Sequence, residues 1–187
     1  MYILYLQKIK MACLNDCPKF NVDNEYYTKK KMWENIIHLI PKDKTIYEMC
    51  LLNSNSKSIE YMKELGIKNV VGDKSWDCLT FKPIKYDMII TNIPFETNIK
   101  KKILTKLVEI DKPFIIILNS MNIYSKYFRD IFGDNLKYLQ IIIPLGKIKF
   151  EKYNVETEDM EKLKDPSFYC CYLAYKMNIP QEELWLK

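Results

Sequence analysis

The segment that most constrains the fold of this chain is the run Met88-Ile89-Ile90-Thr91, which is followed directly by Asn92-Ile93-Pro94-Phe95. Four apolar or β-branched residues in succession predict a short strand that is buried on both faces, as in a parallel sheet. The strand ends in a polar amide, a rigid proline turn and an aromatic ring. Open parallel sheets bind their ligands at the carboxyl ends of the strands. We therefore expect Asn92 and Phe95 to lie at a binding site on that edge.

Strand and helix patterns alternate on both sides of this run. Apolar residues at helical spacing predict helices over 32–40, 59–65, 99–108 and 119–132. Apolar runs predict further strands over 45–48, 68–72, 112–118, 139–144, 147–150 and 167–176. Thr28 is the expected N-cap of the first helix, and the charged segment 153–166 is expected to be a mobile loop or a single helix turn. The alternation predicts an α/β fold with right-handed crossovers and a parallel sheet.

Length and composition fit one globular domain. With 187 residues, 48% of them hydrophobic and 28% charged, the chain can bury a substantial core and lacks the composition of a disordered protein. We interpret residues 1–22 as an N-terminal extension of undecided structure and residues 23–187 as the domain. The apolar opening is too short for a membrane span and has no signal-peptide pattern, so no membrane association is expected.

Cysteine and lysine usage bear on compartment and partners. Six cysteines and the single histidine, His38, show no paired metal-ligand spacing, so no metal site is expected. Free thiols are typical of a reducing compartment, which predicts an intracellular protein, cytoplasmic or nuclear. The net charge is +5, with lysines clustered at 29–31, 100–102 and 147–152. These clusters suit the phosphate backbone of a nucleic acid, although lysine-rich surfaces are more often simply solvated.

The sequence Asn92-Ile93-Pro94-Phe95, after a strand that begins at Tyr86-Asp87, resembles a known motif. It is similar to the Asn-Pro-Pro-Phe/Tyr motif of class I, Rossmann-like S-adenosylmethionine-dependent methyltransferases that act on amino or amide nitrogens. N6-adenine methyltransferases of nucleic acids are the best-known members. The resemblance continues in order from about Asn24 to about Lys176. It implies a three-layer Rossmann-like sandwich whose mostly parallel sheet has an antiparallel edge, with S-adenosylmethionine as cofactor and nucleic acid as substrate.

The resemblance also implies roles for the four motif residues. An exocyclic adenine nitrogen is a poor nucleophile, and acceptors for its amino hydrogens can hold it in line with the methyl group. The side-chain oxygen of Asn92 and the backbone carbonyl of Ile93 would be these acceptors. Phe95 would stack on a base that is flipped out or single-stranded. Ile93 replaces the usual first proline, and Pro94 still steers it towards extended geometry.

Five further residues are the cofactor candidates of the resemblance. Thr28 would help to close the pocket, and Glu48 is the acidic residue expected after the first core strand. Asp73 would accept hydrogen bonds from ribose hydroxyls. Trp76 and Asp77 would take the aromatic and acidic positions beside the adenine. Each also has an ordinary structural interpretation: a helix cap for Thr28, a turn for Asp73 and core packing for Trp76.

The loop after the first core strand departs from the family pattern, so the sequence is compatible with more than one function. Residues 49–58 hold no glycine where relatives have a glycine-rich turn that lets the backbone approach the cofactor. The sequence is therefore compatible with an active enzyme and with an inactive methyltransferase fold that serves as a binding or scaffolding subunit. A third possibility is an enzyme that methylates protein glutamine. Because no segment is large enough for a separate recognition domain, a protein partner that supplies target recognition is also compatible with the sequence.

Overall fold

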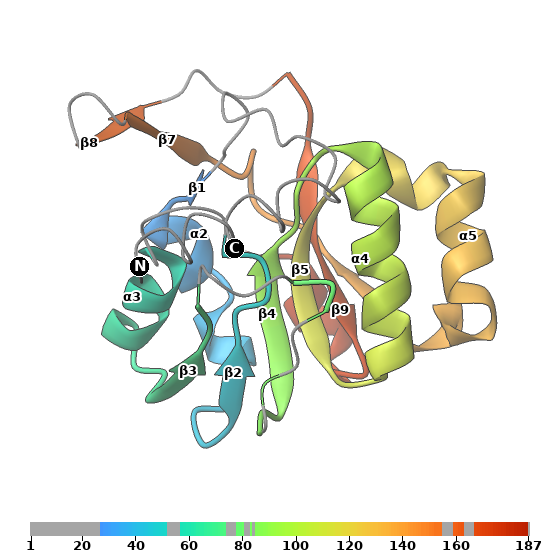
Figure 1. The fold of residues 1–187 in the computed structure, drawn as a ribbon, viewed down its shortest axis with the longest axis horizontal. Coiled ribbons are helices and arrows are strands. Elements are labelled where there is room, and N and C mark those ends of the chain that lie inside the picture. Colours follow the sequence, from blue (N-terminus) through green and yellow to red (C-terminus); the bar gives the residue numbers. More distant parts are fainter. Residues whose placement is uncertain are drawn as a thin grey trace, which may run out of the picture.

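The computed structural model describes residues 27–51, 57–73, 78–80, 83, 85–154, 159–162 and 167–186. The extension at 1–22 and two predicted cofactor residues, Trp76 and Asp77, lie outside these residues. Within the described part, a six-stranded sheet has the order β3-β2-β4-β5-β9-β6 (Figure 1). Its strands are β2 (Thr45–Tyr47), β3 (Asn69–Val71), β4 (Met88–Asn92), β5 (Phe114–Asn119), β6 (Leu139–Ile142) and β9 (Cys170–Tyr175).

The sheet is parallel through β3, β2, β4 and β5, and antiparallel at its other edge. Strand β9 runs antiparallel to both of its neighbours, β5 and β6. The predicted central strand is confirmed, because all of β4 except its last residue, Asn92, is buried. The molecule is thus a mixed α/β, Rossmann-like fold with a mostly parallel sheet, and its antiparallel edge matches the expectation drawn from the family resemblance.

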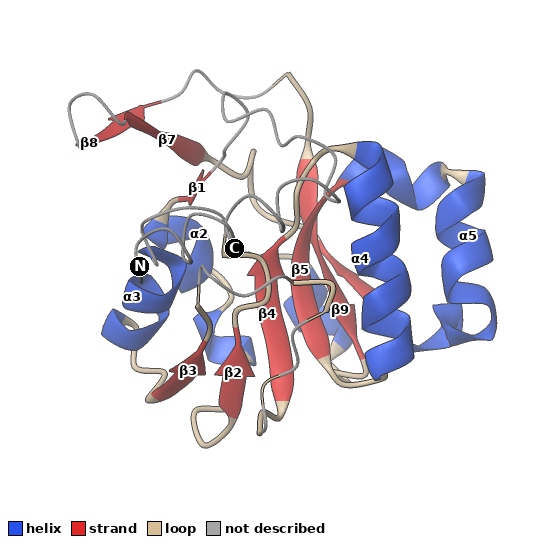
Figure 2. Cartoon of the chain, in the orientation of Figure 1, coloured by secondary structure: helices blue, strands red, loops and turns tan. Residues whose placement is uncertain are grey.

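Helices cover both faces of the sheet (Figure 2). Alternate strand residues point to opposite faces, so Ile90 and Ile115 pack towards α2 (Lys30–Glu34) and α3 (Lys57–Glu64). Ile89 and Ile116 pack towards the other face, with α4 (Thr97–Ile110) and α5 (Lys126–Phe132). The result is a three-layer sandwich in which the central strands are buried on both faces.

The strand order creates a topological switch point between β2 and β4. From β2 the chain passes to β3 on one side, and it then returns to β4 on the other side of β2. Crossovers that leave in opposite directions open a crevice beyond the carboxyl ends of the two strands, where doubly wound sheets bind ligands. Glu48 follows β2 directly and Asn92 ends β4. The fold therefore brings these two predicted site residues to the same edge.

A second, three-stranded sheet contradicts part of the sequence prediction. It has the order β1-β7-β8, from β1 (Tyr27–Thr28), β7 (Phe150–Asn154) and β8 (Asp159–Lys162), and lies above α2 in the view of Figure 1. The predicted strand at 147–150 was wrong, because β7 begins only at Phe150. The prediction of a loop or helix turn over 153–166 was also wrong where the chain forms β7 and β8, which pair antiparallel. Two charged strands without an apolar run left no signal in the sequence.

Two predicted helices are broken, and one predicted cap was wrong. The helix expected over 32–40 is α2 followed by a 3-10 turn, η2 (Ile37–Leu39). The helix expected over 119–132 is a 3-10 turn, η3 (Ser120–Tyr124), followed by α5. Thr28 is not a cap: Lys29 occupies that position without a side-chain hydrogen bond, because Thr28 pairs with Phe150 in the small sheet. Two further 3-10 turns are η4 (Gly133–Tyr138) and η5 (Gln181–Leu184).

Candidate functional site

The motif residues form a fixed turn between β4 and α4. Asn92 pairs with Ile117 of the neighbouring strand and is half-buried, and Ile93 is 1% exposed. Glu96 begins the helix: its carboxylate accepts hydrogen bonds from the backbone N–H groups of Asn98 at 3.0 Å and Ile99 at 2.7 Å. These bonds satisfy amides at the helix N-terminus that would otherwise lack partners. The turn is therefore held by the sheet at one end and by a helix cap at the other.

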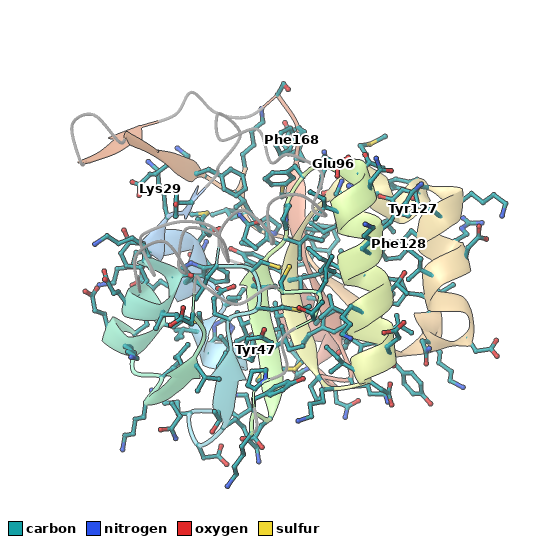
Figure 3. All side chains as sticks on the ribbon, in the orientation of Figure 1. Lys29, Tyr47, Glu96, Tyr127, Phe128 and Phe168 are labelled. Carbon is teal, nitrogen blue, oxygen red and sulfur yellow. The ribbon has the colours of Figure 1, made fainter. Side chains whose placement is uncertain are left out.

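Phe95 lies in an aromatic cluster that joins the motif to the small sheet. Its ring centroid is 5.5 Å from that of Phe150 in β7, edge to face, and 5.1 Å from that of Phe168. Figure 3 labels Phe168 above the main sheet and near Glu96 at the start of α4. Phe95 is half-buried among these rings, so only part of its surface is left for the base that it was predicted to stack on. Phe150 and Phe168 were not singled out from the sequence.

Thr28 reaches the same cluster from the opposite side. It pairs with Phe150, whose ring packs on Phe95, and Lys29 pairs with Glu151 of β7 at 3.6 Å. Thr28 is 6% exposed, and its hydroxyl has no hydrogen-bond partner among the described residues. A buried hydroxyl without a partner is unusual in a folded protein and suits a position that a ligand completes. The structure thus places Thr28 beside Phe150, whose ring contacts the motif residue Phe95, and not as a helix cap.

Glu48 is the most perturbed carboxyl group at the switch point. It is 2% exposed, and its Oε1 accepts hydrogen bonds from the Thr91 hydroxyl and from the backbone N–H of Cys50 at 3.2 Å. The same N–H lies 3.1 Å from the Thr91 hydroxyl oxygen. These contacts bind the loop after β2 to the residue that precedes Asn92. They connect Glu48 to the strand that ends at Asn92.

Burial is the main influence on the pKa of Glu48. It raises the pKa of the carboxyl group to about 7, although Thr91, Ser58 and the Cys50 amide all favour the charged form. The second oxygen, Oε2, is buried and has no hydrogen-bond partner among the described residues. A buried carboxyl group with a raised pKa beside a crevice is typical of functional sites, and also of buried structural networks.

The loop after β2 achieves close packing without a glycine of its own. Gly72, which follows β3, lies so close to this loop that an added Cβ would be 2.7 Å from the Glu48 carbonyl oxygen and 2.9 Å from Leu51 Cδ1. The glycine that permits close approach is therefore on the neighbouring strand. Asp73 comes next and is exposed, at the carboxyl end of β3, where its carboxylate can accept hydrogen bonds from hydroxyl groups.

These residues offer a set of side-chain oxygens that partly fits a nucleoside ligand. Asp73 suits ribose hydroxyls, and Glu48 and Thr28 each present a buried oxygen that lacks a hydrogen-bond partner among the residues that the structure describes. Leu51, in contrast, packs beside Gly72 in a loop whose residues 49–58 hold no glycine. The chemistry of the site therefore fits the cofactor that the resemblance implies, whereas the composition of the loop, which lacks glycine, differs from the family pattern.

A scan against protein-family models and a search of curated protein sequences each return no match. Solved structures do match. A dimethyladenosine transferase from Plasmodium falciparum has a TM-score of 0.43 and 13% sequence identity, with 86% of this chain and 64% of that chain covered. A putative methyltransferase from Thermoplasma acidophilum has a TM-score of 0.37 and 16% identity, with 80% and 64% covered. The chain thus spans less than two thirds of the length of either structure.

Two absences complete the description of the site and its surroundings. In the part of the chain that the structure describes, no three histidine, cysteine or acidic side chains lie close enough together to hold a metal ion. None of the helices in the same residues is long and apolar enough to cross a membrane.

Proposed function

We propose that this chain is an S-adenosylmethionine-dependent methyltransferase of N6-adenine type that acts on nucleic acid. One observation carries the proposal: Asn92 ends β4 at the topological switch point, directly after a threonine that is hydrogen-bonded to the buried Glu48 at the end of β2. This is the crevice in which a doubly wound sheet binds its ligand. The resemblance of residues 92–95 to the methyltransferase motif supports the same assignment.

Each residue of the site would have a defined task. The bound cofactor supplies a methyl group on a positively charged sulfur. Asp73 would accept hydrogen bonds from its ribose, and Trp76 and Asp77 would lie beside its adenine. Glu48 would hold the loop after β2 in place through its hydrogen bonds to Cys50 and Thr91. Thr28 would help to close the pocket from the small sheet.

On the substrate side, the motif would orient the nucleophile. The Asn92 side-chain oxygen and the Ile93 carbonyl would accept hydrogen bonds from the amino group of adenine, and Pro94 would restrict the turn that presents them. Phe95 would contact the base with the part of its ring that Phe150 and Phe168 leave uncovered. Methyl transfer then depends on alignment and on the exclusion of water.

A second function is favoured by a specific observation at the loop after β2. Leu51 is buried and packs beside Gly72, where the resembled family has glycine backbone next to the cofactor. If this packing excludes the cofactor, the chain is an inactive methyltransferase fold that serves as a binding or scaffolding subunit, together with a protein partner that recognises the target.

Isothermal titration calorimetry with S-adenosylmethionine separates the two functions. Binding supports the enzyme, whereas no heat at millimolar cofactor supports the inactive subunit. Transfer of a radiolabelled methyl group should then be compared for DNA, RNA and a protein extract. Label in nucleic acid is the expected result. Label in protein alone would support the third assignment, methylation of glutamine, whose amide nitrogen presents the same chemical problem to the same motif.

A further inference from the structure

The last residues of β4 have backbone pairing on one side of the strand. Within the described residues, β2 pairs with β4 as far as Tyr47 and Ile89, whereas β4 itself continues to Asn92. On its other side, β4 stays paired with β5 up to Asn92. The two strands at the switch point therefore separate just before the motif, and the end of β4 needs another contact to hold it against the loop after β2.

The Thr91 side chain supplies that contact. Its hydroxyl donates a hydrogen bond to Oε1 of Glu48 and accepts one from the backbone N–H of Cys50 at 3.1 Å. Glu48 is also tied to β3, because its own N–H donates to the Val71 carbonyl oxygen at 2.9 Å. A series of hydrogen bonds therefore runs from β3, through the loop after β2, to the residue that precedes Asn92.

The contact depends on the hydroxyl group of Thr91. A hydroxyl both donates and accepts, so it can join the carboxylate of Glu48, which accepts, to the N–H of Cys50, which donates. Valine has nearly the same shape and can do neither. Thr91 is 0% exposed and β-branched, so few χ1 angles are open to it and the direction of the hydroxyl is restricted.

We propose that Thr91 is a positioning residue, whose hydroxyl holds the end of β4 against the loop after β2 and so aligns Asn92 with the bound cofactor. The inference rests on the function proposed above and names a residue on which its methyl-transfer step depends. In this role Thr91 touches neither substrate nor cofactor, and it acts through Glu48 on one side and Asn92 on the other. Displacement of a reacting group by about 1 Å can cost about 10²-fold in rate, so a contact that fixes the strand end should have a measurable effect.

A purely structural role for Thr91 predicts a different result. If the hydroxyl served only to satisfy the buried Glu48, its loss would lower the stability of the protein. The molecules that remained folded would still transfer methyl groups at the wild-type rate. If the hydroxyl aligns Asn92, the folded molecules themselves are slower at saturating cofactor. The rate per folded molecule therefore separates the two roles.

The titration of Glu48 reports the hydrogen bond without any need for activity. The bond from Thr91 favours the charged carboxylate, so its loss should raise the pKa of Glu48 above the wild-type value of about 7. Two other titratable groups interact with Glu48, and both stay protonated near this pH. Burial raises the pKa of Tyr47, and a hydrogen bond to Cys78, together with burial, raises that of Cys50. A shift in this range therefore belongs to Glu48.

The test compares substitutions at Thr91 with one at the other end of β2. Thr91→Val removes the hydroxyl and keeps the shape. Thr91→Ser and Thr91→Ala form a second pair that differs only in the hydroxyl, so the comparison does not depend on the folding of one variant. Thr45→Val is the control, because Thr45 begins β2, at the end away from Glu48, and bonds to Asp87 through its backbone N–H.

Three measurements are made on each variant. Transfer of radiolabelled methyl to an adenine-containing single strand at saturating S-adenosylmethionine gives the rate, corrected for the folded fraction from urea denaturation. Calorimetry gives the affinity for the cofactor. NMR titration of isotope-labelled glutamate carboxyl groups gives the pKa of Glu48, whose signal is assigned by its absence in Glu48→Gln.

Thr91→Val and Thr91→Ala should transfer methyl groups about 10- to 100-fold more slowly per folded molecule. Cofactor affinity should fall only a few-fold, since the bonds of Glu48 to Val71 and Cys50 remain. The pKa of Glu48 should rise in both variants. Thr91→Ser should recover most of the rate and the wild-type titration, and Thr45→Val should match the wild type in all three measurements.

Any of three results overturns the inference and leaves the proposed function in place. They are a wild-type rate per folded molecule in Thr91→Val, an unchanged Glu48 titration in that variant, and equal losses of rate in Thr91→Ser and Thr91→Ala. A wild type that neither binds S-adenosylmethionine nor transfers its methyl group rejects the proposed function, and the positioning role with it. The two failures are thus distinguished by the activity of the wild type.

Discussion

The turn after β4 and the loop after β2 meet at one edge of the sheet, but they are built differently. The turn at 92–96 is fixed by strand pairing, by Pro94 and by the two hydrogen bonds that Glu96 accepts. The loop that begins at Glu48 is fixed by burial: the Glu48 carboxyl group is enclosed, and Gly72, which directly follows β3, packs against the loop. In the proposed function the first arrangement would present polar groups to a ligand, whereas the second mainly fills space.

The proposed site thus has two parts of different construction: the turn at 92–96, here called the substrate half, and the loop after β2 that begins at Glu48, here called the cofactor half. Because they are fixed by different contacts, the two halves can vary independently in sequence. Thr91 connects them, since its hydroxyl bonds to Glu48 and accepts from the Cys50 amide, while the next residue is the predicted catalytic Asn92. A turn that matches the motif can therefore occur beside a loop that holds no glycine in residues 49–58. Substitutions on each side should therefore separate activity from stability.

The largest effect is expected from Asn92→Ala. If the amide oxygen orients the amino group of the substrate, methyl transfer should fall by about 10²- to 10³-fold, as on loss of a transition-state hydrogen bond. Binding of S-adenosylmethionine and the melting temperature should change little. Transfer of radiolabelled methyl to adenine-containing single strands measures the first effect, and calorimetry measures the second.

Asn98→Ala is the matched control for that substitution. Asn98 is an exposed asparagine on the first turn of α4, and only its backbone N–H contributes to the cap. Transfer by this variant should equal that of the wild type. Equal losses in both variants, or loss of cofactor binding in Asn92→Ala, would remove the distinction between a substrate half and a cofactor half.

The second prediction concerns pH and the cofactor half. The folded pKa of Glu48 is raised from 4.5 to about 7, so between these values the unfolded chain releases a proton that the folded protein retains. The contribution of Glu48 to stability therefore falls as pH rises through this window, by at most about 3 kcal/mol, and is constant above it. Glu48→Gln does not titrate and should gain stability relative to the wild type from pH 5 to pH 8.

Urea denaturation of both proteins across that range measures the difference. Subtracting the variant curve removes the other titrating groups, including Glu96 and Asp111, whose pKa values are lowered by their hydrogen bonds and whose contributions are lost as pH falls. A difference that is the same at pH 5 and pH 8 would show that Glu48 is not held in its buried environment.

The sequence predicted the parts of this structure whose signals are local. Residues 88–91 and 112–118 are continuous apolar runs, and residues 99–108 have apolar residues at helical spacing. The structure confirms these predictions as β4, β5 and α4. The placement of Asn92 at the carboxyl edge followed from the run at 88–91. The roles of the predicted site residues stay predictions.

What the sequence did not predict depends on contacts between distant segments. The strand β1 has two residues and pairs with β7 more than 100 positions later, so no run of apolar residues marks either one. Phe150 and Phe168 meet Phe95 only in the folded protein, and Tyr169 differs from buried neighbours such as Tyr172 only in its exposure.

The third prediction tests how tightly the cofactor half is packed. Gly72→Ala would place its Cβ 2.7 Å from the Glu48 carbonyl oxygen, which is backbone and cannot rotate away. Overpacking of this kind costs about 1–3 kcal/mol. Gly146→Ala is the control, because its added Cβ would meet nothing within 4 Å. The urea concentration at the midpoint of unfolding should fall for Gly72→Ala and stay unchanged for Gly146→Ala. Equal midpoints for the two variants would show that the loop after β2 can shift to accommodate the added methyl group at little cost.

The smallest effect is expected from Glu96→Ala, which tests the substrate half. Loss of the cap should destabilise the protein by about 1 kcal/mol, since two backbone N–H groups lose their acceptor. Glu109→Ala, on the same helix, removes only an exposed ion pair with Lys106 and should cost a few tenths, about 0.3 kcal/mol. Glu96→Asp should restore most of the loss. If Glu96→Ala and Glu109→Ala unfold at the same urea concentration, strand pairing and Pro94 fix the turn without the cap, and the two halves differ less in construction than the hydrogen bonds indicate.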